Sequence, residues 1–185
     1  MKITVLGGSG FVGSHVADKL TESGHKVTIY DLKKSKYLKR NQEMVIGDIL
    51  NKKLLERVIS KSDVVYNFAA IADIDQSISL PIETAKINIL GELSVLELCK
   101  KYSIKRHVFA STIYVYSLSG NFYRCSKQSA ESFIEEYNKL HNLNYTILRF
   151  GSLYGPRSDK TNGIYKIIKE SLKKKKMVYE GNKKA

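Results

Sequence analysis

The sequence predicts an α/β fold in which a doubly wound parallel sheet is flanked by helices. Three observations support this fold class. Apolar runs of about five residues alternate with longer stretches of helical periodicity, as in repeated β-α-β units. The first apolar run leads into a glycine-rich turn that opens a helix. Finally, 185 residues, of which 43% are hydrophobic, are enough to build one substantial core and exclude a disordered chain.

Strands and helices are expected to alternate from the first residues onward. Short runs rich in apolar and β-branched residues predict strands at Lys2–Leu6, Lys26–Tyr30, Glu43–Ile46, Asp63–Asn67, Arg106–Ala110 and Asn144–Leu148. Longer segments with a helical period predict helices at Phe11–Ser23, Lys52–Ser60, Ile82–Tyr102, Tyr123–His141 and Gly163–Lys175. Pro81 stands in the first turn of its helix, where its missing N–H does no harm, and Pro156 falls in a turn after the sixth strand.

The chain is strongly basic, with Lys+Arg 31 against Asp+Glu 18 and a net charge of +13. Such an excess indicates an anionic partner: nucleic acid, a membrane surface or a phosphorylated small molecule. Many of the lysines lie in runs such as Lys173–Lys176, which is typical of a solvated surface. The sequence contains no recognition element for nucleic acid, and its apolar runs are too short to cross a bilayer. We therefore expect neither a nucleic-acid nor a membrane partner.

The cysteines and histidines favour a reduced protein without a metal. Cys99 and Cys125 are 26 positions apart, which matches neither a CxxC pair nor a zinc spacing. The four histidines are scattered, so no metal site is predicted. Met1 leads directly into a strand pattern rather than a secretory signal, and we expect a cytoplasmic location.

A glycine-rich turn follows the first predicted strand and has the spacing of a dinucleotide-binding loop. Gly7 permits the tight turn, Gly10 lets the backbone approach a pyrophosphate, and Gly13 allows close packing of helix on strand. The N-terminus of the following helix favours an anion. Asp31, 18 residues after Gly13, ends the second strand, where a carboxylate binds the adenosine ribose and favours NAD over NADP. Lys33, two residues further on, would instead stabilise the 2′-phosphate of NADP. The simpler alternative to a dinucleotide site is an ordinary strand–helix turn with an aspartate on the surface nearby.

A second constellation combines a YxxxK motif with a strand that ends in hydroxyl residues. Tyr123 and Lys127 share one helical face, so we expect the ammonium to lie beside the phenol and to lower its pKa, as a general base for an alcohol proton requires. Ser111 and Thr112 end the fifth strand, and the ligand crevice of an open parallel sheet lies at such strand ends. A chance YxxxK on a lysine-rich helix, with hydroxyls that only cap a strand, is the alternative.

These motifs occur together with others in a fixed order. The additional ones are Gly47–Ile49, Asn67–Ala70, Asn88, Leu148–Arg149 and Tyr154–Arg157. In this combination the chain resembles the extended short-chain dehydrogenases/reductases, and within them the NAD-dependent epimerase/dehydratase family, whose best-known members act on nucleotide sugars. The resemblance implies a Rossmann-type fold, NAD as cofactor and a nucleotide-sugar substrate.

The resemblance also implies roles for individual residues. The implied catalytic residues are Thr112, Tyr123 and Lys127. The implied cofactor-binding residues are Gly7, Gly10, Phe11, Val12, Gly13, Asp31, Asp48, Ile49, Phe68, Ala69, Ala70, Asn88, Tyr123 and Lys127. The implied substrate-binding residues are Ser111, Ser152 and Arg157, although Ser152 stands where the family usually has asparagine.

The same resemblance favours one activity within the family. Dehydratases follow the catalytic threonine with Asp and Glu, whereas this chain has Ile113 and Tyr114, so we expect an epimerase. A related nucleotide-sugar oxidoreductase, or a dinucleotide-binding module without catalysis, remains open as an alternative. Family members continue for on the order of a hundred residues beyond this point, so we expect a cofactor domain over residues 1–160 and the start of a substrate-binding region over residues 161–185. The resemblance also suggests a homodimer through helices Ile82–Tyr102 and Tyr123–His141.

Overall fold

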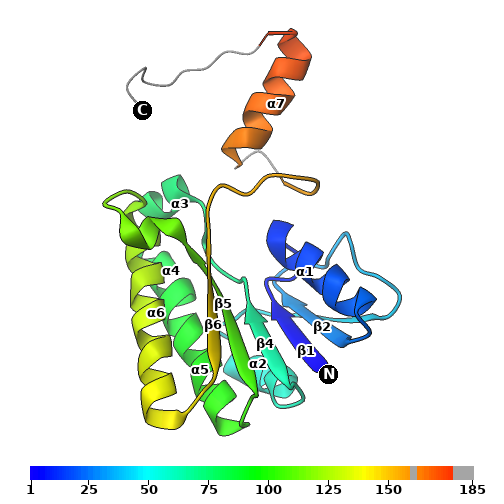
Figure 1. The fold of residues 1–185 in the computed structure, drawn as a ribbon, viewed down its shortest axis with the longest axis vertical. Helices are drawn as coiled ribbons and strands as arrows, with labels where there is room; N and C mark the ends of the chain where they lie inside the picture. The colour runs from blue at the N-terminus through cyan, green and yellow to red at the C-terminus, as the bar shows by residue number, and fades with distance from the viewer. Residues whose placement is uncertain (159–161, 177–185) are drawn as a thin grey trace. The chain divides into compact units, whose positions relative to one another are not determined.

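Six parallel strands form one sheet in the computed structural model, which describes residues 1–158 and 162–176 (Figure 1). The strand order is β3-β2-β1-β4-β5-β6, and each neighbouring pair is parallel. The chain winds outward from β1 to β3, returns to the other side of β1 and winds outward again to β6, which confirms the predicted doubly wound fold. The strands are β1 (Lys2–Leu6), β2 (Lys26–Asp31), β3 (Gln42–Ile46), β4 (Val64–Asn67), β5 (Arg106–Thr112) and β6 (Tyr145–Phe150).

Helices cover the sheet on both faces and bury two apolar cores. They are α1 (Phe11–Glu22), α2 (Lys52–Ile59), α3 (Ile74–Ser79), α4 (Pro81–Ala85), α5 (Gly91–Lys101) and α6 (Asn121–His141). On one face Ala17 of α1 packs with Val5 of β1. On the other face Leu55 of α2, Val95 of α5 and Ile134 of α6 are fully buried in a larger core (Figure 1). Because both faces of the central strands are covered, those strands are apolar on both sides.

The predicted elements agree with the observed ones to within a few residues, apart from an unpredicted 3₁₀ turn at Ile113–Tyr116 and two further differences. The helix predicted over Ile82–Tyr102 consists of α4, a π-helical turn at Lys86–Leu90 and α5. The short helix α3 was not predicted, although Asp73 caps it by accepting a hydrogen bond from the Gln76 N–H, the spacing of a capping box. The π-helical turn bears on the site described below, because such turns are frequent at functional sites.

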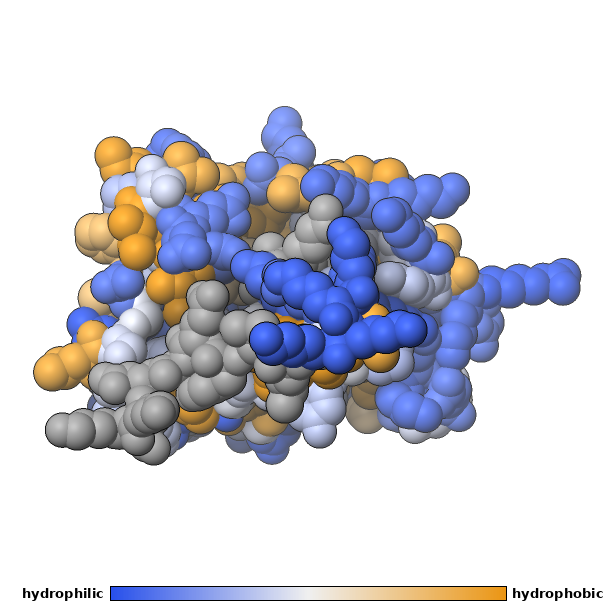
Figure 2. Space-filling view, turned by 90° about the horizontal axis from the view of Figure 1, so that it is seen from above, coloured by the Kyte–Doolittle hydropathy of each residue, from blue (hydrophilic) through white to orange (hydrophobic). Residues whose placement is uncertain are grey.

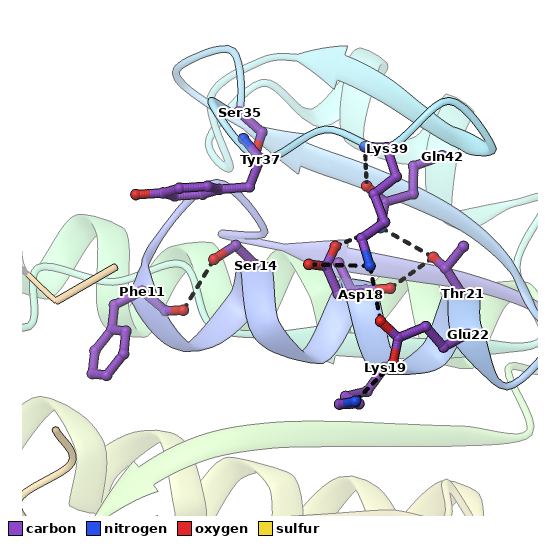
Figure 3. A network of polar contacts seen from close by, with 11 residues as sticks. Phe11, Ser14, Asp18, Lys19, Thr21, Glu22, Ser35, Tyr37, Lys39 and Gln42 are labelled. Carbon is purple, nitrogen blue, oxygen red and sulfur yellow. Dashed lines mark hydrogen bonds and ion pairs between the residues drawn. The ribbon is translucent and has the colours of Figure 1, made fainter. Parts of the chain in front are cut away.

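A polar network fastens the connection between β2 and β3 to helix α1 (Figure 3). The Gln42 amide donates to Asp18 Oδ1 and to Thr21 Oγ1, both at 3.1 Å. Its carbonyl oxygen accepts from the Lys39 N–H at 2.9 Å, and Lys39 Nζ forms an ion pair with Glu22 at 2.9 Å. Residues 32–41, which directly follow the predicted ribose-binding Asp31, are therefore held against the helix that begins at the glycine loop.

The chain divides into two compact units, Met1–Phe150 and Gly151–Ala185. The second unit contains α7 (Gly163–Lys174), which matches the helix predicted there. Asn162 caps α7 by accepting a hydrogen bond from the Tyr165 N–H at 2.9 Å. The predicted domain boundary at residues 160–161 lies outside the described residues.

The surface is rich in charged side chains. Hydrophilic residues cover much of the face drawn in Figure 2, with apolar side chains scattered among them. A span across a membrane would need a long apolar helix, and the described part of the chain contains none.

Candidate active site

The glycine loop joins β1 to α1 and packs tightly against the end of β4. Gly7 has φ +72°, in the left-handed region, and a Cβ at this position would lie 2.5 Å from the Ala69 nitrogen. A Cβ on Gly13 would collide with the carbonyl oxygen of Gly7. Gly10 precedes α1, whose first N–H groups at Phe11 and Val12 have no acceptor within the helix by geometry. This end of α1 is therefore suited to bind an anion.

Asp31 lies beside this loop at the end of β2. Its Oδ2 accepts a hydrogen bond from the Ser9 N–H at 2.9 Å, and its Oδ1 accepts one from the Lys33 N–H at 3.2 Å. The Ser9 hydroxyl donates to the carbonyl oxygen of Lys33 at 2.7 Å. The structure thus brings the predicted ribose acceptor and the predicted pyrophosphate loop together.

Asp48 and Ile49 follow β3 and differ in exposure. The exposed Asp48 side chain accepts a hydrogen bond from the Leu50 N–H at 2.9 Å, and its carbonyl oxygen accepts one from the Tyr30 hydroxyl at 2.7 Å. Ile49 is buried in the larger core and lies against Gly91. The Ile49 side chain therefore packs in the core, and only its backbone is left to contact a ligand.

The residues after β4 connect the glycine loop to helix α6. Phe68 N–H donates to the Leu6 carbonyl at 2.9 Å, which extends the strand pairing into the predicted cofactor-lining segment Phe68–Ala70. Beyond it, Asn88 of the π-helical turn accepts from the Ile71 N–H at 2.8 Å and donates to Ser126 Oγ at 2.9 Å. Asn88 therefore fixes this segment relative to the helix that carries the YxxxK motif.

Thr112, Tyr123 and Lys127 meet at the junction of β5 and α6. Thr112 is the last residue of β5, and Tyr123 lies in the first turn of α6, one turn before Lys127. Lys127 Nζ donates to the Ala110 carbonyl at 2.7 Å and lies 5.8 Å from the centre of the Tyr123 ring. Thr112 and Lys127 are buried and Tyr123 is mostly buried, so the predicted catalytic residues lie together in one largely desolvated site.

The electrostatics of Tyr123 differ from the prediction. Burial raises its pKa to about 12, the charge of Tyr114 adds to the rise, and a hydrogen bond with Thr112 opposes it. The expectation that Lys127 lowers the phenol pKa is wrong for this structure, because desolvation of the phenolate is the largest influence and the opposing one is the Thr112 hydrogen bond. Burial likewise lowers the pKa of Lys127 to about 8, against the attraction of Glu92 and Glu131.

The three predicted substrate residues fall in different parts of the chain. Ser111 is buried on β5 next to Thr112, and its hydroxyl has no hydrogen-bond partner within the described ranges. Ser152 and Arg157 belong to the second compact unit. The Asp and Glu positions of a dehydratase are taken by Ile113, which is half exposed, and Tyr114, both in a 3₁₀ turn.

Three buried polar residues lie beneath this site, and the sequence patterns singled out only Asn67, as part of the Asn67–Ala70 motif. They are Asn67 at the end of β4, Glu92 on α5 and His107 on β5, and each is at most 2% exposed. A signal for Glu92 existed: it shares the buried face of α5 with Val95 and Cys99, where a charged residue interrupts an apolar stripe.

The fold and the site together define a dinucleotide-binding α/β domain that carries a Thr-Tyr-Lys set at the carboxyl edge of its sheet. A sequence profile of the NAD dependent epimerase/dehydratase family matches residues 3–185, and the chain belongs to this family. NAD is accordingly the cofactor that the family membership supports.

Individual relatives agree with this assignment. The chain is 34% identical to a candidate UDP-glucose 4-epimerase of Methanocaldococcus jannaschii in an alignment 175 positions long, which covers 85% of this chain and 57% of that protein. The solved UDP-glucose 4-epimerase of Thermotoga maritima with UDP-glucose aligns with a TM-score of 0.90 and 32% identity, over 99% of this chain and 66% of that one. The UDP-glucose 4-epimerase of Thermus thermophilus in complex with NAD aligns with a TM-score of 0.85 and 28% identity, over 94% of this chain and 63% of that one. The chain thus spans about half to two thirds of the length of its relatives.

Proposed function

We propose that this chain is an NAD-dependent nucleotide-sugar epimerase, or the cofactor-binding part of one, which transiently oxidises a sugar hydroxyl. The observation that carries the proposal is the convergence of Thr112, Tyr123 and Lys127 at the strand edge that also bears the glycine loop. A glycine loop alone would support binding, whereas a buried hydroxyl, phenol and ammonium together support proton transfer.

The residues present fit NAD. A Cβ at Gly7 or Gly13 would collide with backbone atoms, so only glycine permits the tight turn and the close helix packing of this loop. Both are features of dinucleotide-binding loops. The first turn of α1 offers N–H groups to the pyrophosphate, and the Asp31 carboxylate would accept the ribose hydroxyls. We further propose that Asp48, Ile49, Phe68–Ala70 and Asn88 line or support this site.

The chemistry supplied by bound NAD is the reversible acceptance of a hydride. Tyr123 would exchange a proton with the substrate hydroxyl through its phenol oxygen. Thr112 favours the phenolate, since its hydrogen bond lowers the Tyr123 pKa, and Lys127, with its Nζ 5.8 Å from the centre of the Tyr123 ring, is the proposed third member of the set. Thr112 and Lys127 are buried, and Tyr123 is partly buried, so the proton transfer would take place with little water around it.

Epimerisation fits this chain better than dehydration. Elimination of water needs an acid and a base beside the threonine, and Ile113 and Tyr114 supply no carboxylate there. A related nucleotide-sugar oxidoreductase would use the same three residues. The alternative of a dinucleotide-binding module without turnover rests on the short span of the chain relative to its relatives.

The remaining proposals concern substrate, assembly and location. Ser111, Ser152 and Arg157 would contact a nucleotide sugar, with residues 1–160 as cofactor domain and residues 161–185 as the start of a substrate-binding region. Exposed apolar side chains on α4, the π-helical turn and α6 support a homodimer; they are Ile82, Leu90, Phe133 and Leu140. Two free cysteines, Cys99 and Cys125, support a reducing compartment such as the cytoplasm.

One experiment separates the main hypotheses. NADH is titrated with the protein while nicotinamide fluorescence is followed, and the same preparation is incubated with NAD and UDP-glucose while UDP-galactose is measured. Binding together with interconversion supports the epimerase, and binding without turnover supports the module. An unchanged fluorescence spectrum at high protein concentration would refute both.

A further inference from the structure

A chain of buried hydrogen bonds runs from the inner core to the wall of the proposed cofactor site. His107 Nε2 lies 2.6 Å from Glu92 Oε1. The second oxygen of Glu92 accepts a hydrogen bond from Asn67 Nδ2 at 2.6 Å. Asn67 Oδ1 in turn accepts from the Ala69 N–H at 2.9 Å. The chain therefore crosses from β5 through α5 to the end of β4.

The last link of this chain touches the glycine loop. Ala69 is the residue whose nitrogen leaves no room for a side chain on Gly7. The neighbouring Phe68 N–H is already bound to the carbonyl of Leu6 at the end of β1. A rotation of the Asn67–Ala69 segment would therefore move the surface against which the glycine loop packs.

Each member of the chain restricts the orientation of the next. A carboxylate only accepts hydrogen bonds, so Glu92 must face the NH₂ end of the Asn67 amide. The carbonyl end of that amide is then directed at the Ala69 N–H. His107 holds the carboxylate in place: burial favours the neutral ring, but the Glu92 charge and the hydrogen bond with Glu92 raise the His107 pKa to about 10. Because a carboxylate only accepts, the Nε2–H of His107 donates to Glu92 Oε1.

We propose that Glu92, fixed by His107, is a positioning residue that acts through Asn67 to hold the Ala69 backbone against the glycine loop. The inference rests on the proposed cofactor site and deepens it. Packing alone does not require a buried ion pair here, because replacing such a pair by apolar residues of similar volume often leaves stability unchanged or raises it. The proposal gives this ion pair a role in positioning the backbone. The surroundings are already apolar, with Leu96 and Phe109 fully buried nearby.

The decisive variant removes both members of the ion pair, and Lys127 keeps Glu131 as its acidic neighbour. In Glu92→Met/His107→Leu the core keeps its volume, and Asn67 loses the acceptor that orients it. We expect a moderately lower unfolding midpoint, because the buried Asn67 NH₂ loses its acceptor, together with amide exchange at Ala69 about tenfold faster in the cofactor-free protein and an NADH dissociation constant about tenfold higher. Hydrogen exchange is read by NMR, and NADH binding by fluorescence.

Two further variants make the result independent of the stability of the double variant. Asn67→Ala removes only the last link, and it should accelerate exchange at Ala69 even if the double variant fails to fold. Val95→Ala is the matched control, since it weakens the same helix at a fully buried apolar position outside the chain of hydrogen bonds. It should lower stability without a selective effect on Ala69.

The outcomes are distinct. Wild-type exchange at Ala69 and wild-type NADH affinity in the double variant, or in Asn67→Ala, would overturn the proposal, as would an equal acceleration in Val95→Ala. If the wild-type chain binds no NADH, the proposed function fails, whereas exchange at Ala69 still decides whether Glu92 positions this backbone.

Discussion

The two halves of the candidate site are built by different physical means. On the side of β1 and β2, the glycine loop and Asp31 present backbone N–H groups and a carboxylate. On the side of β5 and α6, Tyr123 and Lys127 are buried, and burial shifts the pKa of both. The geometry of the first half depends on glycines, which have no side chain. The chemistry of the second half depends on charged and polar side chains that are shielded from water.

The two halves also differ in what supports them. A glycine loop needs only room and helix geometry, which local sequence provides. Buried ionisable groups need partners, and here Lys127 lies within the influence of Glu92 and Glu131. Glu131 is itself bound by Arg149 of β6 at 2.7 Å. The catalytic half therefore depends on residues from several elements, and we expect substitutions there to affect rate and pH dependence before cofactor binding.

The largest effect is expected from Tyr123→Phe, which removes the proton-transferring oxygen and leaves the glycine loop intact. Loss of a general acid–base group costs roughly 10²–10⁴-fold in rate, so interconversion of UDP-glucose and UDP-galactose should become undetectable or nearly so. NADH affinity should stay within about twofold of the wild type. Tyr102→Phe is the control, since it deletes a phenol that binds Glu56 at the far end of α5. Equal turnover in Tyr123→Phe would remove this residue from its role.

Gly13→Ala tests the other half. The new Cβ would strike the Gly7 carbonyl and approach Gly8 Cα to 2.9 Å, so the loop must shift. We expect the free energy of unfolding to fall by about 1–3 kcal/mol and NADH affinity to fall at least about tenfold. Urea denaturation and fluorescence titration measure the two effects. Gly163→Ala should change neither, because its Cβ meets no atom within 4 Å.

Asp31→Ala is expected to weaken binding less. It removes the acceptor for the ribose hydroxyls, which corresponds to about 1.4 kcal/mol or tenfold in NADH affinity. It also removes the charge that repels a 2′-phosphate, so the preference for NADH over NADPH should shrink. Titrations with both nucleotides measure this ratio. Asp75→Ala, in the first turn of α3, provides an aspartate control, and an unchanged NADH:NADPH ratio in Asp31→Ala would contradict the assignment.

The difference between the halves explains what the sequence revealed. The strands, the helices, the doubly wound fold class and the glycine loop with Asp31 follow from local patterns of apolar residues and glycine spacing. The proximity of Thr112 to Tyr123 followed from strand-end topology. The direction of the Tyr123 pKa shift and the roles of Glu92 and His107 did not, because burial and contacts between residues distant in the chain decide them.

The smallest effect concerns the pH dependence of stability. The Lys127 pKa is about 8 in the folded protein against 10.5 for a solvated lysine. At a pH between these two values the unfolded chain binds more protons at Lys127 than the folded protein does. The contribution of Lys127 to the free energy of unfolding therefore rises with pH. Compared with Lys127→Met, the wild type should gain about 1 kcal/mol in the free energy of unfolding from pH 8 to pH 9. Below pH 7 the difference between the two proteins should be constant.

His107 changes the free energy of unfolding with pH in the opposite direction to Lys127. The wild type must therefore be compared with Lys127→Met rather than studied alone. The pKa of His107 is raised from 6.5 to about 10, so its stabilising contribution is complete below about pH 6.5 and is lost as the pH rises toward 10. Both proteins retain His107, and its contribution cancels in their difference. Urea denaturation at each pH therefore isolates Lys127. A flat difference from pH 7 to pH 10 would show that this ammonium is not desolvated. The contrast between a half built from backbone groups and a half built from buried side chains would then fail at Lys127.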